Sequence, residues 1–178
     1  MRVSITDIVD QPGATRPVEV AVGAEEFGSD PWGTADGAVR DPIELDLHLD
    51  SVVDGILVRG TLVFHLDLAC ARCLETQTSV REVNVAELFI DPAKRVEDDV
   101  DDEPGYELLD DATAIDLSTM VRDALIIDLP VRTLCREDCQ GLCPTCGADR
   151  NRIDCGHQQD EGIDPRWSAL ADLELPND

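Results

Sequence analysis

Alternating hydrophobic and polar residues mark the middle of the chain. From Ile43 to Leu49, leucine or isoleucine alternates with acids and a histidine, the period of a half-buried β-strand. The dipeptide Asp54-Gly55 then predicts a hairpin turn. A second strand is predicted over Ile56–Leu68, with a bulge at Gly60, and a third over Thr76–Ile90. Three β segments joined by short links predict an antiparallel β-sheet or a partly closed β-barrel.

The remaining elements are one helix and several short segments. A helix is predicted over about residues 116–129, because Asp116 is suited to be its N-cap and Pro130 ends it. Short alternating runs within residues 1–40 predict further strands, and Asp164-Pro165 predicts a short last helix. The apolar side chains of the main helix recur on one face and are expected to pack on the sheet: Leu117, Met120, Val121, Ala124, Leu125 and Ile127.

These elements predict an α+β fold with two parts. Residues 1–130 are expected to form a β-rich body that carries the helix and an acidic loop over residues 91–111. Residues 131–178 are expected to form a cysteine-rich, metal-binding ribbon with the short terminal helix. A length of 178 residues suits one domain with such a small appendage.

The net charge of −25 limits the partners of the protein. Ten acids and two bases lie within residues 91–111, so most of the charge is spread over the rest of the chain. A surface of this sign repels the phosphates of DNA and attracts basic partners. The charge alone is also compatible with a role in solubility only.

The N-terminal sequence and the cysteine count predict a cytoplasmic protein. Residues 1–20 contain no apolar stretch of the kind found in secretory signals, and the apolar run Ala124–Ile127 is too short to span a membrane. In a reducing compartment, seven cysteines are better read as metal ligands than as disulfides, and their odd number agrees with this interpretation.

The segment Cys143-Pro-Thr-Cys146-Gly predicts a structural zinc site. Two intervening residues allow both sulfurs to face one ion, and the following glycine permits the turn beneath it. The tetrahedron is completed either by Cys155 and His157, which is the favoured set, or by Cys135 and Cys139. With four protein ligands such an ion has no open position for a substrate, so it would serve folding.

Cys70 and Cys73 form a second C-x-x-C pair at the predicted turn between the second and third strands. Three interpretations stay open for this pair: two small residues that shape a tight turn, ligands of a second metal site shared with the cysteines left over downstream, or a redox pair. The flanking β segments differ from the helix start at which thioredoxin-like pairs lie.

No catalytic constellation is visible in the sequence. There is no glycine-rich phosphate loop and no G-x-S-x-G motif, and His48 and His65 lie on predicted strands. The many acids lack the apolar surroundings that would raise their pKa for acid catalysis. A protein that is not an enzyme is therefore expected.

Three motifs resemble the YceD family of bacterial and plastid proteins. The segment Leu68–Leu74 is similar to the family's L-x-C-x-R-C motif, and Ile115–Val131 is similar to its helix with a Leu-Pro ending. The cysteine pattern from Leu134 to Cys155, followed by Asp164-Pro-Arg-Trp167, is similar to its cysteine tail. This chain ends its pattern with Cys-Gly-His157, where the family commonly has C-x-C, and histidine can replace cysteine as a zinc ligand.

The resemblance implies a role in the accumulation of large-subunit ribosomal RNA. A non-enzymatic assembly factor of this charge is expected to hold a basic ribosomal protein, or to reach a precursor of large-subunit rRNA through a local basic site. The candidate RNA contacts are Arg150 and Arg152 beside the zinc knuckle and Arg72 at the hairpin tip. The alternative function is a zinc-thiolate redox sensor that regulates a partner when its thiolates are oxidised.

Overall fold

The computed structural model describes residues 1–27, 37–94, 105–109, 112–157 and 166. Seven strands, one α-helix and two 3₁₀ turns lie in these ranges. In chain order they are β1 (Arg2–Ser4), β2 (Thr15–Val22), η1 (Ala24–Phe27), β3 (Gly37–Val52), β4 (Gly55–Ala69), β5 (Thr76–Ile90), η2 (Pro92–Lys94), β6 (Tyr106–Glu107), β7 (Ala114–Asp116) and α1 (Ser118–Asp128).

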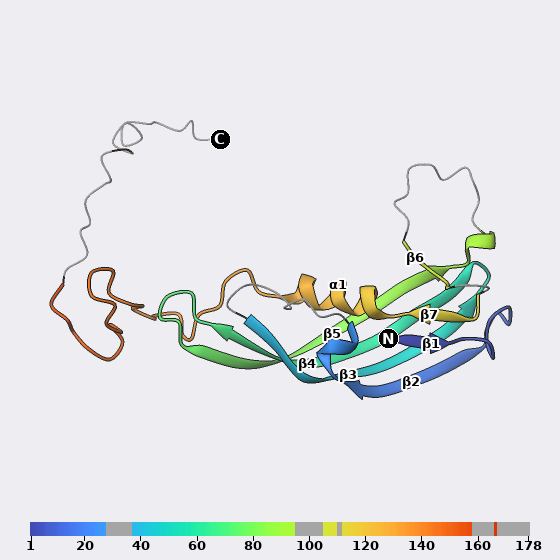
Figure 1. The fold of residues 1–178 in the computed structure, drawn as a ribbon, viewed down its shortest axis with the longest axis horizontal. Coiled ribbons are helices and arrows are strands. Elements are labelled where there is room, and N and C mark those ends of the chain that lie inside the picture. The colour runs from blue at the N-terminus through green and yellow to red at the C-terminus, as the bar shows by residue number, and fades with distance from the viewer. Residues whose placement is uncertain (28–36, 95–104, 110–111, 158–165, 167–178) are drawn as a thin grey trace.

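A curved five-stranded sheet in the order β2-β3-β4-β5-β6 forms the body (Figure 1). Neighbouring strands are antiparallel except for the short β6, which runs parallel to β5. Within the described ranges β2 and β6 do not pair with each other, so the sheet is open. The antiparallel sheet is confirmed as the main feature, and the partly closed barrel is wrong.

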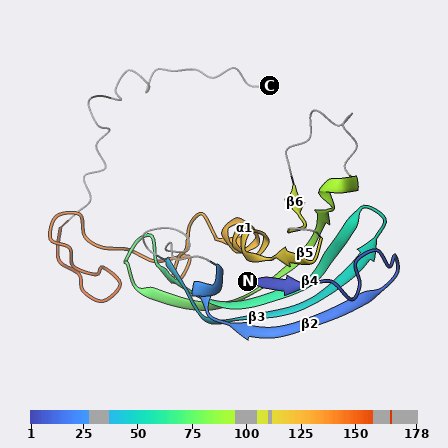
Figure 2. The same ribbon diagram turned by 45° about the vertical axis from the view of Figure 1, so that its right-hand side comes forward.

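The second layer of the body lies on the concave side of the sheet. Strands β1 and β7 form a separate two-stranded ribbon, and α1 follows β7 directly. Figure 2 shows α1 in the hollow of the sheet, which its apolar face covers. The layers bury one continuous core of aliphatic side chains with few aromatic rings, including Ile43, Leu47, Leu62, Phe64, Leu66, Leu117 and Val121.

The helix begins and ends close to its predicted limits. The N-cap position is occupied by Leu117, so the prediction of Asp116 at this position is wrong by one residue. The Asp116 carboxylate nevertheless accepts a hydrogen bond from the Ser118 backbone N–H at 2.9 Å and satisfies one donor of the first turn. Most of the predicted apolar stripe is buried. Ile127 is the exception, since 84% of it is exposed and it does not belong to the core.

The acidic segment between β5 and β7 packs at its ends. Leu108 is buried in the core, and the Tyr106 ring stacks on Phe89 with centroids 5.2 Å apart. These positions of the predicted acidic loop therefore pack against the body. Residues 95–104 and the predicted helix that follows Asp164 lie outside the described residues, apart from Arg166. In the described part of the chain, no helix is long and apolar enough to cross a bilayer.

Gly60 lies in regular register opposite Leu47, so the predicted bulge at this position is wrong. The register shift between β3 and β4 falls instead between Arg40 and Glu44. Gly60 has a φ of +150°, and a Cβ atom built there would lie 2.1 Å from the carbonyl oxygen of Asp46. Glycine is required because the neighbouring strand passes too close for any side chain.

Replacing Gly60 with alanine is expected to lower the free energy of unfolding by on the order of 2 kcal/mol or more, because the strand must shift or adopt a strained φ. Urea unfolding followed by circular dichroism measures this change. Gly105→Ala is the control, since its added Cβ meets no atom within 4 Å. Equal stability of the two variants would contradict the close approach at Gly60.

Candidate metal centres

Two groups of four side chains that could hold a metal ion lie in the described part of the chain. Each residue of a group offers one ligand atom, and the ligand atoms within a group all lie within 4.8 Å of one another. The first group, called the buried cluster, contains Cys70, Cys73, Cys135 and Cys139. The second group, called the exposed cluster, contains Cys143, Cys146, Cys155 and His157.

The two C-x-x-C segments have the same backbone turn. In the exposed cluster, Gly147 N–H donates to the Cys143 carbonyl at 2.8 Å, and Cys143 N–H donates to the Ala148 carbonyl at 2.8 Å. In the buried cluster, Leu74 N–H donates to the Cys70 carbonyl at 2.9 Å, and Cys70 N–H donates to the Glu75 carbonyl at 2.9 Å.

The residue after the second cysteine has a positive φ in both turns, 62° at Leu74 and 72° at Gly147. A non-glycine residue rarely adopts this conformation. The hairpin tip between β4 and β5 therefore has the same turn as the Cys143–Gly147 segment, although it lacks the glycine found there.

The sulfur distances of the buried cluster match a tetrahedral zinc site. Cys70 Sγ lies 3.8 Å from Cys139 Sγ, and Cys73 Sγ lies 3.6 Å from Cys135 Sγ. Four sulfurs at the usual zinc–sulfur distance of about 2.3 Å are about 3.8 Å apart in a tetrahedron. All seven cysteines are free thiols, and a disulfide would need its sulfurs about 2 Å apart. The arrangement therefore fits one ion per cluster.

Backbone N–H groups lower the pKa of one thiol in each cluster. Burial acts to raise the pKa of the Cys70 thiol, but N–H groups of Cys73, Cys135 and Arg72 directed at the sulfur lower this pKa to about 6. The N–H groups of Cys146 and Thr145 likewise lower the pKa of Cys143 to about 6.

One thiol of each cluster, Cys135 and Cys146, resists ionisation. Burial, together with the neighbouring sulfurs, raises the pKa of Cys135 to about 12. At Cys146, the Ala148 N–H acts to lower the pKa, but the nearby Cys143 sulfur and burial outweigh it, so the pKa is raised. Thiols this close can all ionise only when a cation neutralises them, which is the chemistry that a divalent metal supplies.

The buried cluster joins the hairpin tip to the chain that follows α1. Ala71 N–H donates to the Thr133 carbonyl at 2.8 Å, and Leu142 N–H donates to the Arg72 carbonyl at 3.0 Å. The sulfurs of Cys70, Cys73 and Cys139 form a small core of their own, apart from that of the sheet. A metal ion here would attach the C-terminal segment to the far end of the β body.

Asn151 supports the buried cluster and was missed by the sequence analysis. Its side-chain amide lies 3.5 Å from Cys139 Sγ as a donor, and its Oδ1 accepts hydrogen bonds from the Gln140 N–H and the Arg136 guanidinium, both at 2.8 Å. Groups of this kind orient metal ligands and stabilise their charge. An asparagine in a polar loop carries no sequence signal for such a role.

The geometry favours one of the two ligand sets considered for the Cys143 knuckle. It groups this knuckle with Cys155 and His157, and it places Cys135 and Cys139 with the hairpin tip. The interpretation of Cys70 and Cys73 as a tight turn is compatible with metal binding, since the turn is the same as that at Cys143. That these residues bind an ion stays a prediction, as do the ion's identity and the division at residue 131.

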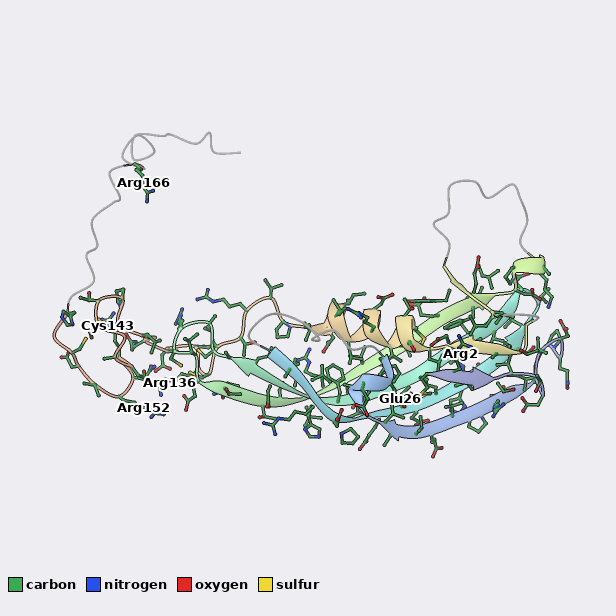
Figure 3. All side chains as sticks on the ribbon, viewed as in Figure 1. Arg2, Glu26, Arg136, Cys143, Arg152 and Arg166 are labelled. Carbon is green, nitrogen blue, oxygen red and sulfur yellow. The ribbon has the colours of Figure 1, made fainter. Side chains whose placement is uncertain are left out.

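The candidate RNA-binding arginines differ in the contacts that their side chains already make within the protein. The Arg72 guanidinium donates to the carbonyls of Glu137 and Cys139, at 3.0 and 2.8 Å, so it braces the buried cluster. Arg152 pairs with Glu75 and with Asp149, at 3.4 and 3.3 Å. Figure 3 shows Arg136 and Arg152 at the same end of the molecule as Cys143. Arg150, beside a shallow hollow at Gly141, makes no side-chain ion pair with a described residue.

Arg72→Ala is expected to accelerate zinc release from the buried cluster by about tenfold, because outer residues that hold the ligands commonly contribute 10- to 100-fold to metal affinity. Release to a chelator, followed with a colorimetric indicator, measures this rate. Arg150→Ala removes the same charge without touching Glu137 or Cys139, and its release rate should equal that of the unmodified protein. Equal rates for both variants would show that Arg72 has no bracing role.

Comparison with known proteins places these features in a family. The sequence profile of the family described as "Large ribosomal RNA subunit accumulation protein YceD" matches residues 58–174, which include both clusters. An uncharacterized protein of Mycobacterium tuberculosis is 33% identical over 174 residues, covering 97% of this chain and 81% of the relative. An uncharacterized protein of Mycobacterium leprae is 32% identical over 179 residues, covering 97% of this chain and 77% of the relative.

A plant relative carries a functional name. The "Large ribosomal RNA subunit accumulation protein YCED homolog 1, chloroplastic" of Arabidopsis thaliana is 35% identical over 54 residues, which is 29% of this chain and 17% of that protein. No solved structure matches the chain. The family profile covers well over half of the sequence, and the motifs at the hairpin tip, the helix and the cysteine tail all lie within it. The chain therefore belongs to the YceD family of large ribosomal RNA subunit accumulation proteins.

Proposed function

We propose that this protein is a non-enzymatic factor that promotes assembly of the large ribosomal subunit and accumulation of its rRNA. Membership of the YceD family is the observation that carries the proposal. The protein would act by binding a component of the subunit, and the cytoplasm is the compartment in which such a factor would work.

In this proposal the metal centres are structural. Each cluster offers four protein ligands, so a zinc ion bound there would have no open position for catalysis. Zinc would supply folding free energy to a segment that has little apolar core, and would hold that segment against the hairpin tip. The body and the segment from residue 131 would then present one continuous binding surface.

A basic ribosomal protein is the favoured direct partner. The net charge of −25 opposes approach of an RNA phosphate backbone and attracts a cationic polypeptide. Two of the three arginines considered for RNA contact are already paired within the protein. Contact with large-subunit rRNA would then be a secondary interaction centred on Arg150.

Depletion and co-purification test the proposal together. Cells depleted of the protein should accumulate large-subunit precursors, and sucrose-gradient profiles should show a lower ratio of large to small subunits. A tagged protein at physiological salt should co-purify with such precursors or with one basic ribosomal protein. Unchanged large-subunit levels after depletion would reject the proposal.

Exposure of the second cluster supports one alternative, a redox sensor. Cys146 and His157 are exposed, so an oxidant such as a peroxide could reach a thiolate there and release the ion. Zinc release at low peroxide, together with a change in partner binding, would favour this function. Retention of zinc under the same conditions would dismiss it.

A further inference from the structure

Strand β5 has a long open edge. It pairs with β4 along its whole length, Thr76–Ile90, but on its other side the described residues contribute only β6, opposite Phe89 and Ile90. Natural sheets commonly protect such an edge with proline, a bulge or a covering element. Strand β5 contains no proline, and its register with β4 is uninterrupted.

The backbone bonds show which groups face outward. Asp91 N–H donates to the Asp54 carbonyl and Cys70 N–H donates to the Glu75 carbonyl, both at 2.9 Å, so the odd-numbered residues are in hydrogen-bonded pairs with β4. The even-numbered residues from Thr78 to Leu88 therefore direct their N–H and C=O groups away from β4. The carbonyl of Ile90, which has the same orientation, accepts the Leu108 N–H at 3.0 Å.

A groove of about 270 Å³ lies between this strand and α1. Its apolar lining includes Val83, Val85 and Ile127. Ile127 is the exposed member of the apolar stripe on α1. One end is bounded by the ion pair between Arg81 and Asp128, whose Nε and Oδ2 atoms lie 2.6 Å apart.

At the other end of the groove, the Tyr106 hydroxyl donates to the Asp123 carboxylate at 2.8 Å. Glu87 is an exposed acid on the groove, and it forms no ion pair with a described residue. Glu82 points to the opposite face of the same strand, where it lies in one shallow hollow with Glu44 and Asp46. An added strand would therefore meet negative charge on both of its faces.

We propose that the edge of β5 and the groove beside α1 bind an extended, basic segment of a partner protein as an additional strand. Backbone bonds from the even-numbered residues would hold the segment, its apolar side chains would fill the groove, and its lysines or arginines would face Glu82 and Glu87. This inference deepens the proposed function and rests on it for the partner's identity as a ribosomal protein. A second copy of this chain would bring the same acids against each other, so self-pairing is disfavoured.

Binding of synthetic peptides to the full-length, zinc-loaded protein tests the inference. A fluorescent peptide of alternating lysine and valine should bind, whereas the glutamate–valine peptide should not, and anisotropy at physiological salt measures both affinities. Hydrogen exchange should slow at the even-numbered amides from Thr78 to Leu88 when the lysine peptide is bound. Equal binding of the two peptides, or protection only elsewhere in the chain, would overturn the inference.

Variants separate the backbone contribution from the charge contribution. Asn84→Pro removes one outward N–H and is expected to weaken binding by about tenfold, whereas Asn84→Ala loses the same side-chain contact with Thr61 but keeps the N–H. Glu87→Lys should weaken binding similarly. Glu25→Lys in η1 is the control, since it makes the same charge change at an exposed residue that lines neither the groove nor the hollow around Glu82. If Asn84→Pro alters the unfolding transition, the Glu87 and Glu25 pair decides the question.

Complementation distinguishes this inference from the proposed function. If Glu87→Lys and Asn84→Pro proteins fully restore large-subunit levels in depleted cells and bind the peptide normally, the edge is not the binding site, and the assembly function is unaffected. If depletion has no effect on ribosomes but the peptide binds at the edge, the surface is supported and the assembly function is rejected.

Discussion

Replacement of Cys139 with serine is expected to remove one of two zinc ions and to release the C-terminal segment from the hairpin tip. Cys139 lies in the buried cluster, where its sulfur is 3.8 Å from that of Cys70. Structural zinc contributes on the order of 10 kcal/mol to the folding of small zinc domains, so little would hold this junction without the ion. Elemental analysis should find about one zinc per chain, and limited proteolysis should cleave between Val131 and Leu142.

Cys146→Ser provides the matched control, because it removes one ligand of the exposed cluster and leaves the buried cluster intact. This variant should also retain about one zinc per chain, but its new cleavage sites should fall between Cys143 and His157. Loss of both ions in either variant would show that the clusters bind metal as one unit. Two ions retained in Cys139→Ser, or no zinc in the unmodified protein, would refute the proposed centres.

The sheet was predictable because its signals are local. The predicted strand Thr76–Ile90 has the same limits as β5, and the predicted Asp54-Gly55 turn lies at the connection between β3 and β4. Gly60 shows where local signals are insufficient, since a glycine in a strand is compatible either with a bulge or with close approach of a neighbouring strand. The structure shows close approach, because the Asp46 carbonyl lies next to Gly60. This contact exists only in the folded sheet, so the local sequence cannot reveal it.

The metal centres were only partly predictable, because half of their geometry is non-local. The knuckle at Cys143 carries a glycine signal, whereas the equivalent turn at Cys70 has Leu74 at the position of positive φ. Cys139 is 69 residues from Cys70 in sequence, and spacing alone cannot pair cysteines over such a distance. The exposure of Ile127 was missed for a related reason, since helical periodicity does not reveal where the core ends.

Replacement of Phe64 with alanine is expected to make the buried cluster lose its ion at lower urea, without changing the urea concentration at which the exposed cluster loses its ion. Phe64 is fully buried in the centre of β4, and removing such a ring costs about 3–5 kcal/mol of the 5–15 kcal/mol that stabilises a typical domain. The buried cluster draws Cys70 and Cys73 from the β4–β5 hairpin, so it should lose its ion when the body unfolds. The exposed cluster takes all four ligands from residues 143–157 and should keep its ion.

Urea titration with parallel measurement of circular dichroism and zinc release tests this expectation. In Phe64→Ala the loss of β structure and the release of the first zinc should shift together to lower urea, while the second release should stay where it is in the unmodified protein. Val53→Ala is the control, since Val53 is 71% exposed and its truncation should change stability by less than about 0.5 kcal/mol. If both ions leave with the body, residues 143–157 fold only as part of the sheet domain, and the two-part organisation is wrong.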